Sequence, residues 1–255
     1  MRFLLIKKQI NMLKIINSEI NPPKAIIFDT DNTLYPYSRS HNAAIKSVAI
    51  KASIILDIDE KLFKKTYIFS RNEIKKQLEN TASSHSKLLQ FQRTIENLGL
   101  GTKIFLSLDL EQTYWREFLS NSYLNPGIRE LLIFLKKNQI QTANITDLTS
   151  QIQFRKIIYF NLDNLFDYVV TSEEAGVDKP NKLPFLIALK KLQIEAKDVW
   201  MVGDNFECDI IGAQGLHITS LLYNSKFKTE RMYMEPDIIF DNYYDLLNLI
   251  KRILN

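Results

Sequence analysis

The chain has 255 residues, 45% of them hydrophobic, which is enough to bury a substantial core in one large domain or in a core domain with a smaller inserted one. Its 33 basic and 29 acidic side chains give a formal charge of +4, and the basic residues are spread along the sequence. This distribution lacks the dense basic patch of nucleic-acid-binding proteins and mildly favours small anionic ligands. The single cysteine, Cys208, excludes an internal disulfide and fits a reducing cytoplasm; a small apolar filler is favoured over a catalytic thiol.

Residues 1–23 are expected to be an extension ahead of the core. The apolar run at residues 3–6 ends at Lys7 and Lys8, before the roughly 7 to 15 apolar residues of a signal peptide are complete. No later window reaches the roughly 20 apolar residues that a membrane span requires. We therefore expect a cytoplasmic protein without a membrane partner, whose extension is either a short surface helix or partly disordered.

The first strand of the core is predicted at residues 25–28, directly before an acidic turn. Its apolar run of β-formers stops at the sequence Asp-Thr-Asp-Asn-Thr. Asp29 and Asp31 alternate with Thr30, so an extended backbone places both carboxylates on one side, roughly 7 Å apart. Such a pair repels unless a proton or a cation lies between the groups. A simple polar turn has the same composition, so the rest of the chain must distinguish the two.

Residues 37–122 are predicted to form a helical insert with no convincing strand. Helical periodicity occurs in four pieces, at residues 41–56, 59–80, 86–98 and 109–121. Aromatic and leucine residues at helical spacing are interpreted as the core of the insert, and the lysine pairs 64–65 and 75–76 as solvated helix faces. For His85, in a turn of the insert, a structural role is favoured over a substrate contact. The position of the insert indicates a lid.

After residue 123, strands and helices alternate along the chain. Strands are predicted at residues 139–145, 168–171, 199–202, 217–222 and 237–240. Helices are predicted at residues 128–138, 149–160, 183–192, 206–214 and 243–254. This alternation predicts an α/β core, made of residues 24–36 and 123–255, with a parallel sheet and helices on both faces.

Reactive groups in such a sheet collect at the carboxyl ends of the strands. Polar residues follow three of the predicted strands: Asp29 and Asp31, Thr146 and Asp147, and Asp204. Lys179 stands at the start of a helix, also after a strand. Acids with one lysine and no histidine suit a hard cation such as Mg²⁺ and phosphate oxygens better than zinc or peptide hydrolysis. The lysine would neutralise a phosphate and keep a carboxylate ionised.

These features resemble the four sequence motifs of the haloacid dehalogenase-like superfamily. The residues that carry the resemblance are Asp29-x-Asp31-x-Thr33, Thr146, Lys179-Pro180 with Phe185, and Gly203-Asp204 with Asp209. Their order and spacing match from about residue 24 to the C-terminus, except within the helical insert. The resemblance implies a Rossmann-like core with an all-helical cap inserted between the first and second motifs.

The resemblance also implies a role for each matching residue. Asp29 would be the nucleophile and, through its other oxygen, a ligand of Mg²⁺. Asp31 would be the general acid and base, with its backbone carbonyl on the metal. Asp204 would ligate the metal, and Asp209 would support the metal-bound water or the lysine.

Three further residues would form the phosphate-binding part of the site. Thr146 and Lys179 would bind the phosphoryl group, and the lysine would also orient the nucleophile. Asp147 stands where relatives often carry asparagine, and its negative charge would weaken phosphate binding.

The matching residues narrow the expected chemistry. Because Asp31 is present, dehalogenation and phosphonate cleavage fit poorly. The leading hypothesis is a Mg²⁺-dependent phosphatase that acts on a small phosphorylated metabolite, a sugar phosphate or a nucleotide, through an aspartyl phosphate. A phosphomutase or phosphotransferase, and a non-catalytic binding or regulatory protein, are the alternatives. The protein would be a monomer or a homodimer.

Substrate identity is expected to reside in the cap and at its junction with the core. Tyr35, Tyr37 and Arg39 lie beside the expected hinge and are candidates for substrate contacts. Packing at the junction is an equal alternative for each of them. His217, at the start of a late strand, is interpreted as structural.

Overall fold

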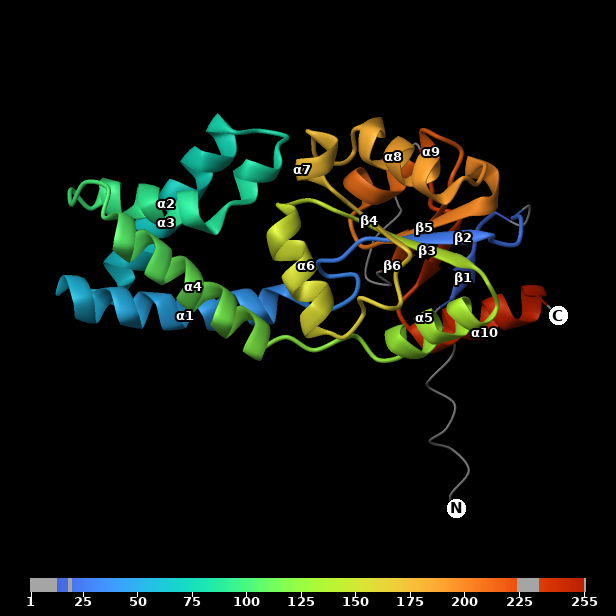
Figure 1. Cartoon of the computed structure of the whole chain (residues 1–255), viewed down its shortest axis with the longest axis horizontal. Helices are drawn as coiled ribbons and strands as arrows, with labels where there is room; N and C mark the ends of the chain where they lie inside the picture. Colours follow the sequence, from blue (N-terminus) through green and yellow to red (C-terminus); the bar gives the residue numbers. More distant parts are fainter. Residues whose placement is uncertain (1–12, 18–19, 224–233, 255) are drawn as a thin grey trace, which may run out of the picture.

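The computed structural model describes residues 13–17, 20–223 and 234–254. These residues form two parts that lie side by side along the longest axis of the molecule, as Figure 1 shows. Helices alone make up one part, and a sheet covered by further helices makes up the other. The chain enters the helical part after the first core strand and then returns to the sheet.

Seven strands form a single sheet in the described part of the chain, in the order β1-β7-β6-β5-β2-β3-β4. They are β1 (Lys14–Ile15), β2 (Ala25–Phe28), β3 (Gln141–Thr146), β4 (Tyr168–Thr171), β5 (Val199–Gly203), β6 (Thr219–Tyr223) and β7 (Ile238–Phe240). All neighbouring pairs are parallel except β1 with β7, which is antiparallel. With helices on both faces, this is the α/β architecture that the alternation predicts, and the fold prediction is confirmed.

Strand β2 lies inside the sheet, between β5 and β3, and sets the position of the acidic turn. All four of its residues are fully buried, which explains its continuous apolar run. Its last residue, Phe28, lies opposite Asn144 of β3 and Val202 of β5. The segments that follow these three strands therefore leave the sheet at the same edge.

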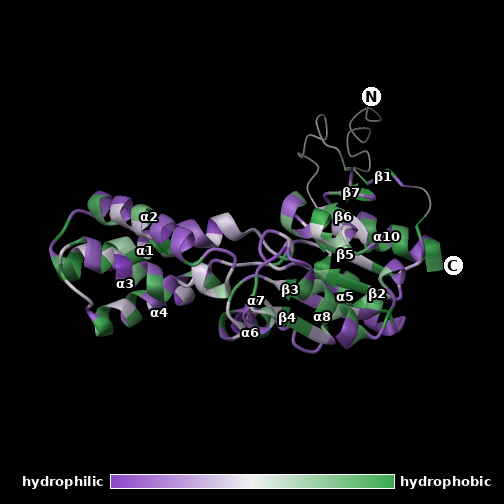
Figure 2. Cartoon of the chain, turned by 90° about the horizontal axis from the view of Figure 1, so that it is seen from above, coloured by the Kyte–Doolittle hydropathy of each residue, from purple (hydrophilic) through white to green (hydrophobic). Residues whose placement is uncertain are grey.

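Successive residues of β2 point to opposite faces of the sheet, where different helices cover them. The helices of this part are α5 (Ile128–Lys137), α6 (Ser150–Tyr159), α7 (Ser172–Ala175), α8 (Lys182–Leu192), α9 (Gly212–Gln214) and α10 (Tyr243–Leu254). Ile26 and Phe28 belong to a hydrophobic cluster with residues of α5 and α10, whereas Ala25 and Ile27 belong to a cluster with residues of α8 and α9. Figure 1 shows these helix pairs on opposite sides of the sheet, and the colours of Figure 2 show hydrophobic residues in its strands.

The helical part has an aromatic interior, which belongs to the same hydrophobic cluster as Phe28 of the sheet. Its elements are α1 (Tyr37–Leu56), α2 (Glu60–Gln77), a short 3-10 helix (Ala82–His85), α3 (Lys87–Asn97) and α4 (Ile104–Ser120). The Asp59 carboxylate and the Ser86 hydroxyl accept hydrogen bonds from the first backbone N–H groups of α2 and α3, so they explain where these helices begin. Buried aromatic side chains fill the interior: Phe63, Tyr67, Phe91, Tyr114 and Phe118. The prediction that aromatic residues form the core of this segment is confirmed.

The N-terminal segment joins the edge of the sheet where it is described. Lys14 and Ile15 pair antiparallel with β7, so this stretch is a strand and not the surface helix that was one expectation. The indole N–H of Trp200 donates a hydrogen bond to the carbonyl of Asn21, which ties the segment to β5. Residues 1–12 and 18–19, to which the same expectation applied, lie outside the described residues.

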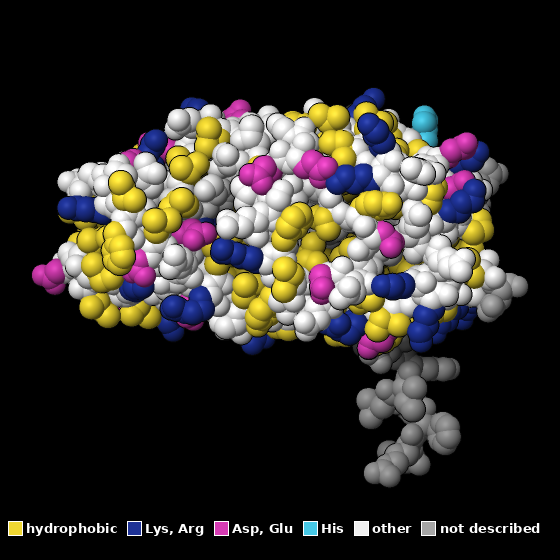
Figure 3. Space-filling view, viewed as in Figure 1, with side chains coloured by type: hydrophobic (Ala, Val, Ile, Leu, Met, Phe, Trp, Pro, Cys, Tyr) yellow, Lys and Arg dark blue, Asp and Glu magenta, His cyan; other side chains and the backbone are white. Residues whose placement is uncertain are grey.

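The surface carries mixed charges. On the face seen in Figure 3, basic and acidic side chains are interspersed among scattered hydrophobic ones. This agrees with the even spread of charge along the sequence. Within the described residues, no helix combines the length and apolar character needed to cross a membrane.

Candidate active site

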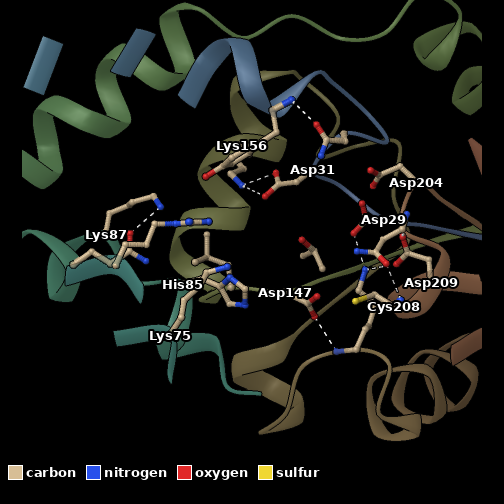
Figure 4. A pocket seen from close by; sticks show the side chains of 18 of the residues that line it. Asp29, Asp31, Lys75, His85, Lys87, Asp147, Lys156, Asp204, Cys208 and Asp209 are labelled. Atoms are coloured by element: carbon tan, nitrogen blue, oxygen red, sulfur yellow. Dashed lines mark hydrogen bonds and ion pairs between the residues drawn. The ribbon is translucent and has the colours of Figure 1, made fainter. Parts of the chain in front are cut away.

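A cavity of about 290 Å³ lies between the carboxyl edge of the sheet and the helical part, and Figure 4 shows it from close by. The seven residues expected to act in catalysis, phosphate binding and metal binding all line this cavity: Asp29, Asp31, Thr146, Asp147, Lys179, Asp204 and Asp209. They come from the ends of β2, β3 and β5, from the loop before α8 and from the π-helical turn Phe206–Ile211. The register of the sheet therefore brings together residues that are far apart in sequence.

The ammonium group of Lys179 lies at the centre of the site. Its Nζ is 2.6 Å from Oδ1 of Asp29 and 2.7 Å from Oδ1 of Asp209, and it donates to the carbonyl of Ile145 at 3.3 Å. Burial lowers the pKa of Lys179, but the charges of Asp209 and Asp29 outweigh this effect and raise it well above 10.5, so the group is a permanent cation. Oδ2 of Asp29 accepts no hydrogen bond from a described residue and is free to meet a ligand.

Three carboxylates gather around this single cation. Asp29, Asp204 and Asp209 each place an oxygen within 4.8 Å of the others. Burial is the main cause that raises the pKa of Asp29 well above 3.8 and that of Asp204 to about 7, and the charge of Asp209 adds to it. The excess negative charge is relieved when a cation binds, and carboxylate oxygens are the ligands that Mg²⁺ prefers. The cluster therefore has the chemistry of a divalent-cation site.

A glycine permits the close approach of these acids. A Cβ atom at Gly203 would lie 2.2 Å from Oδ2 of Asp209, so no larger residue fits at the end of β5 without a shift. The same Oδ2 accepts a hydrogen bond from the backbone N–H of Asn205 at 3.1 Å. These contacts fix the carboxylate of Asp209 beside Lys179.

The turn after β2 is held by the rest of the core. Asn32 adopts a left-handed backbone conformation with φ of 64°, and its side-chain oxygen accepts a hydrogen bond from the backbone N–H of Tyr37. The carbonyl of Thr33 accepts hydrogen bonds from the Asn125 amide at 2.8 Å and from the Tyr243 hydroxyl at 2.9 Å. The acidic turn is thus a fixed platform that directs its carboxylates into the cavity, which favours a reactive site over a simple turn.

The carboxylate of Asp31 is oriented by Lys156, which the sequence analysis did not identify. Nζ of Lys156 lies 2.8 Å from Oδ1 and 3.1 Å from Oδ2 of Asp31, and the hydroxyl of Tyr35 donates to Oδ1. The lysine is buried, with its ammonium 5.5 to 5.8 Å from the ring centres of Tyr35, Trp115 and Phe118. These contacts leave Asp31 a single orientation at the edge of the cavity.

The segment after β3 connects two parts of the site. Thr146 is buried at the end of the strand, and its hydroxyl makes no hydrogen bond with the described residues, so it is free for a ligand. Oδ1 of Asp147 accepts hydrogen bonds from the Ser172 hydroxyl at 2.9 Å and from the backbone N–H of Lys179 at 3.1 Å. Asp147 therefore positions the loop that carries Lys179, while its contact with phosphate stays a prediction. Leu148 follows with φ of 140°, a strained conformation of the kind found at functional turns.

The structure brings one of the three expected substrate contacts to the cavity. Tyr37 lines the cavity, but Tyr35 is fully buried against Asp31 and does not. Arg39 is exposed, with its guanidinium 5.0 Å from the ring centre of Tyr123. Arg39 points away from the cavity because α1 begins at Tyr37, and residues two positions apart on a helix lie on different faces.

The helical part adds basic side chains to the cavity. Four of them line it: Arg71, Lys75, His85 and Lys87. The interpretation of Lys75 as part of a solvated face is wrong, since it is half-buried at the cavity, whereas its neighbour Lys76 is exposed. Nε2 of His85 lies 3.0 Å from Oδ2 of Asp178, so the side chain bridges the helical part and the loop of Lys179.

Cys208 also lines the cavity, but its environment is that of an unreactive thiol. Burial, followed by the charge of Asp209, raises the pKa of the thiol to about 12. Because the thiolate is the nucleophilic form, this environment agrees with the interpretation of the side chain as a filler.

Comparison with known proteins places the chain among hydrolases. The family model for haloacid dehalogenase-like hydrolases matches residues 23–217. A ribulose-1,5-bisphosphate 5-phosphatase of Halopiger xanaduensis is 35% identical over 202 residues, which cover 78% of this chain and 84% of that protein. A glyceraldehyde 3-phosphate phosphatase of Methanopyrus kandleri is 26% identical over 235 residues, which cover 90% of this chain and 98% of that protein.

Solved structures share the fold at lower identity. A 2-haloacid dehalogenase from Pseudomonas syringae pv. tomato has a TM-score of 0.70 at 20% identity and covers 90% of this chain and 99% of its own. A phosphatase of the same superfamily from Thermococcus onnurineus has a TM-score of 0.67 at 21% identity and covers 89% of this chain and 97% of its own. The extent of the family match and the identity with the H. xanaduensis protein show that this chain is an enzyme of the haloacid dehalogenase-like hydrolase family.

Proposed function

We propose that the protein is a Mg²⁺-dependent phosphomonoester hydrolase that cleaves a small sugar phosphate through an aspartyl-phosphate intermediate. The arrangement of Asp29 and Lys179 carries the proposal: one carboxylate oxygen is held 2.6 Å from the ammonium, and the other is free toward the cavity. Relatives named as phosphatases of ribulose 1,5-bisphosphate and of glyceraldehyde 3-phosphate support a sugar phosphate as substrate.

The residues near Asp29 fit a hard divalent cation, because three carboxylates lie close together there and only two of them, Asp29 and Asp209, contact the ammonium of Lys179. The carboxylates of Asp29 and Asp204 and the backbone carbonyl of Asp31 would hold Mg²⁺, with Asp209 in support. When bound, the ion supplies positive charge that lets an anionic carboxylate approach an anionic phosphate.

In the first step, the free oxygen of Asp29 attacks phosphorus as the bond between phosphorus and the leaving oxygen breaks. Asp31 donates a proton to that oxygen, so the products are an alcohol and phosphorylated Asp29. In the second step, Asp31 takes a proton from water, whose oxygen attacks phosphorus. Inorganic phosphate leaves, and both carboxyl groups return to their starting states. Lys179 and Thr146 contact the phosphoryl oxygens throughout.

Asp31 has two proton transfers to make, so its position matters in both steps. The ammonium of Lys156 and the hydroxyl of Tyr35 hold its carboxylate at the edge of the cavity. Lys156 and Tyr35 are therefore positioning residues, since each contacts the carboxylate of Asp31; Lys156 also lines the cavity, whereas Tyr35 does not.

Residues 37–122 enter the proposal as a cap that closes over the site. Two contacts join this part to the loop of Lys179: His85 with the carboxylate of Asp178, and the carbonyl of Asn80 with the backbone N–H of Asp178 at 2.9 Å. Closure excludes water from the phosphoryl group before the leaving group departs, and opening releases the products.

The test is phosphate release from a panel of sugar phosphates, with Mg²⁺ or with EDTA. We expect Mg²⁺-dependent turnover that Asp29→Asn abolishes, because an amide oxygen is a poor nucleophile. Asp163→Asn is the matched control, since Asp163 is an exposed aspartate that does not line the cavity. Rapid-quench detection of phosphate on the unaltered protein tests the covalent intermediate. Absence of phosphate release from every ester by a folded protein would refute the proposal.

A further inference from the structure

The basic side chains of the helical part face the acidic cluster across the cavity. Arg71 and Lys75 are four residues apart on α2 and therefore lie on one face of that helix. Lys87 is the first residue of α3, and all three line the cavity. Figure 4 shows Lys75 and Lys87 on the side away from Asp29, with Asp31 between the two groups.

These three cations differ from the other cations of the cavity in their lack of a counter-charge. Lys179 pairs with Asp29 and Asp209, and Lys156 pairs with Asp31. No ion pair between described residues includes Arg71, Lys75 or Lys87. Three basic side chains that line a cavity and have no acidic partner in the part of the chain that the structure describes form a site that suits an anionic ligand.

Lys87 is the most constrained member of the group. It is only 6% exposed, and its Nζ donates to Oε1 of Gln90 at 3.0 Å and to the hydroxyl of Tyr67 at 3.4 Å, with the ring centre of Tyr114 5.2 Å away. Burial, followed by the charges of Arg71 and Lys75, lowers its pKa. Burying a cation among neutral groups and other cations costs folding free energy. Groups buried at such a cost beside a cavity are often functional.

The transferring phosphoryl group is not the anion that these residues meet. It must reach Asp29, which Figure 4 shows on the side of the cavity away from Lys75 and Lys87, and which Lys179 contacts at 2.6 Å. The cavity holds the volume of roughly ten water molecules, at about 30 Å³ each, which leaves room for a short carbon chain between two charged ends.

We propose that Arg71, Lys75 and Lys87 form a subsite for a second anionic group of the substrate, a phosphate or a carboxylate carried by the leaving group. This inference rests on the proposed phosphatase activity and narrows its substrate to a small phosphoester with two anionic ends. Binding of the second anion draws the cap toward the core, because the three cations belong to the helical part and the reacting phosphate belongs to the sheet.

The test uses α,ω-alkanediol bisphosphates of about three to six carbons, the corresponding monophosphates, and ω-phosphooxy carboxylic acids of the same lengths, all with Mg²⁺. For the unaltered protein, kcat/KM for the best doubly anionic ester should exceed that of its monophosphate by roughly 10- to 100-fold, as expected for a charge-assisted contact. The preferred second group, phosphate or carboxylate, identifies the anion.

Variants localise this preference. Arg71→Met and Lys87→Met should remove most of the advantage of the doubly anionic ester and change monophosphate turnover less than about threefold. Lys76→Met is the matched control, because Lys76 is exposed on the same helix and does not line the cavity. Equal turnover of the two ester classes, or equal losses for both in Lys87→Met, would overturn the subsite.

A binding experiment separates this proposal from the proposed activity. Calorimetry measures the affinity of the alkanediol bisphosphates and monophosphates for Asp29→Asn, with and without Lys87→Met. Tighter binding of the bisphosphate that depends on Lys87 supports the subsite even if no ester is hydrolysed, in which case the proposed function alone fails. Equal binding of the two ligands, or a preference that Lys87→Met leaves intact, overturns the subsite even if hydrolysis is found.

Discussion

Replacement of Lys87 by methionine is expected to stabilise the free protein at neutral pH. The lysine is buried at the first turn of α3, where the helix dipole opposes a positive charge. Burial is the largest cause that lowers its pKa from 10.5 to about 7, and the charges of Arg71, Lys75 and Lys156 add to it, while Asp31 acts in the opposite direction. Methionine has a similar length and no charge to bury.

The expected magnitude follows from the linkage between proton binding and folding. Because the pKa of the lysine is lower in the folded state, the unfolded chain binds more protons between about pH 7 and 10.5. The penalty is therefore fully present below pH 7 and disappears as the pH rises through 10.5. The change from 10.5 to about 7 corresponds to roughly 4 to 5 kcal/mol below pH 7 and to roughly 1 to 2 kcal/mol at pH 9.5.

Lost contacts offset part of this gain. The two hydrogen bonds of the ammonium and its contact with the Tyr114 ring contribute roughly 1 to 3 kcal/mol together. Oε1 of Gln90 stays satisfied, since the hydroxyl of Tyr67 also donates to it at 3.0 Å. The net gain in the free energy of unfolding is then about 1 to 3 kcal/mol at pH 6.5, and it should fall by roughly 3 kcal/mol between pH 6.5 and 9.5.

Urea unfolding of the unaltered protein and of Lys87→Met at pH 6.5 and 9.5, without ligand, measures both quantities. Lys76→Met serves as the control, because it removes an exposed lysine from the neighbouring helix. A Lys87→Met protein whose stability relative to the unaltered protein does not change between the two pH values would refute the reasoning, since a lysine with the same pKa in the folded and unfolded states gives no such pH dependence.

Three further predictions concern the core of the site. Gly203→Ala should lower the free energy of unfolding by about 1 to 3 kcal/mol and lower phosphatase activity, because the new Cβ would meet the carboxylate of Asp209. Gly215→Ala, where the nearest atom to a new Cβ lies at 3.4 Å, should change neither quantity. Urea unfolding and phosphatase turnover measure the difference between the two variants. Lys156→Met should reduce kcat by about 10- to 100-fold and change the pH profile of kcat, since Asp31 loses the partner that orients it; an unchanged profile would contradict a positioning role. Mg²⁺ should raise the Tm of the unaltered protein, by an amount equivalent to about 3 kcal/mol when its concentration is 100 times its Kd. Asp204→Asn should lose this shift in Tm. An equal shift in both proteins would exclude Asp204 as a ligand.

Much of the fold and of the acidic site could be read from the sequence, because local patterns determine them. The apolar run at Ala25–Phe28 and the polar residues that follow it define a buried strand and its end without reference to any other segment. In a parallel sheet, the ends of such strands meet at one edge, so the separate positions of Asp29, Thr146 and Asp204 imply one cavity. Periodicity likewise predicts the four helices of the insert and their aromatic core.

Features that depend on how elements pack against each other were decided only by the tertiary structure. Lys156 lies on the buried face of α6 with Ile152 and Ile157, and a lysine on such an apolar face was the signal that could have indicated a buried cation. Its partner Asp31 is 125 positions away, so the sequence did not show which group the lysine would contact. The rotation of α1 about its axis decided that Tyr37 and not Arg39 reaches the cavity.

The basic subsite shows the same division between sequence and structure. The sequence by itself determined that Lys75 lies on an α-helix, because the 3.6-residue period is local. Only the docking of α2 and α3 over the end of the sheet decided that this lysine, with its partners on the two helices, faces the acids of the core. What a side chain on a surface helix contacts depends on the segment packed opposite it, and that segment is formed by residues far away in the chain.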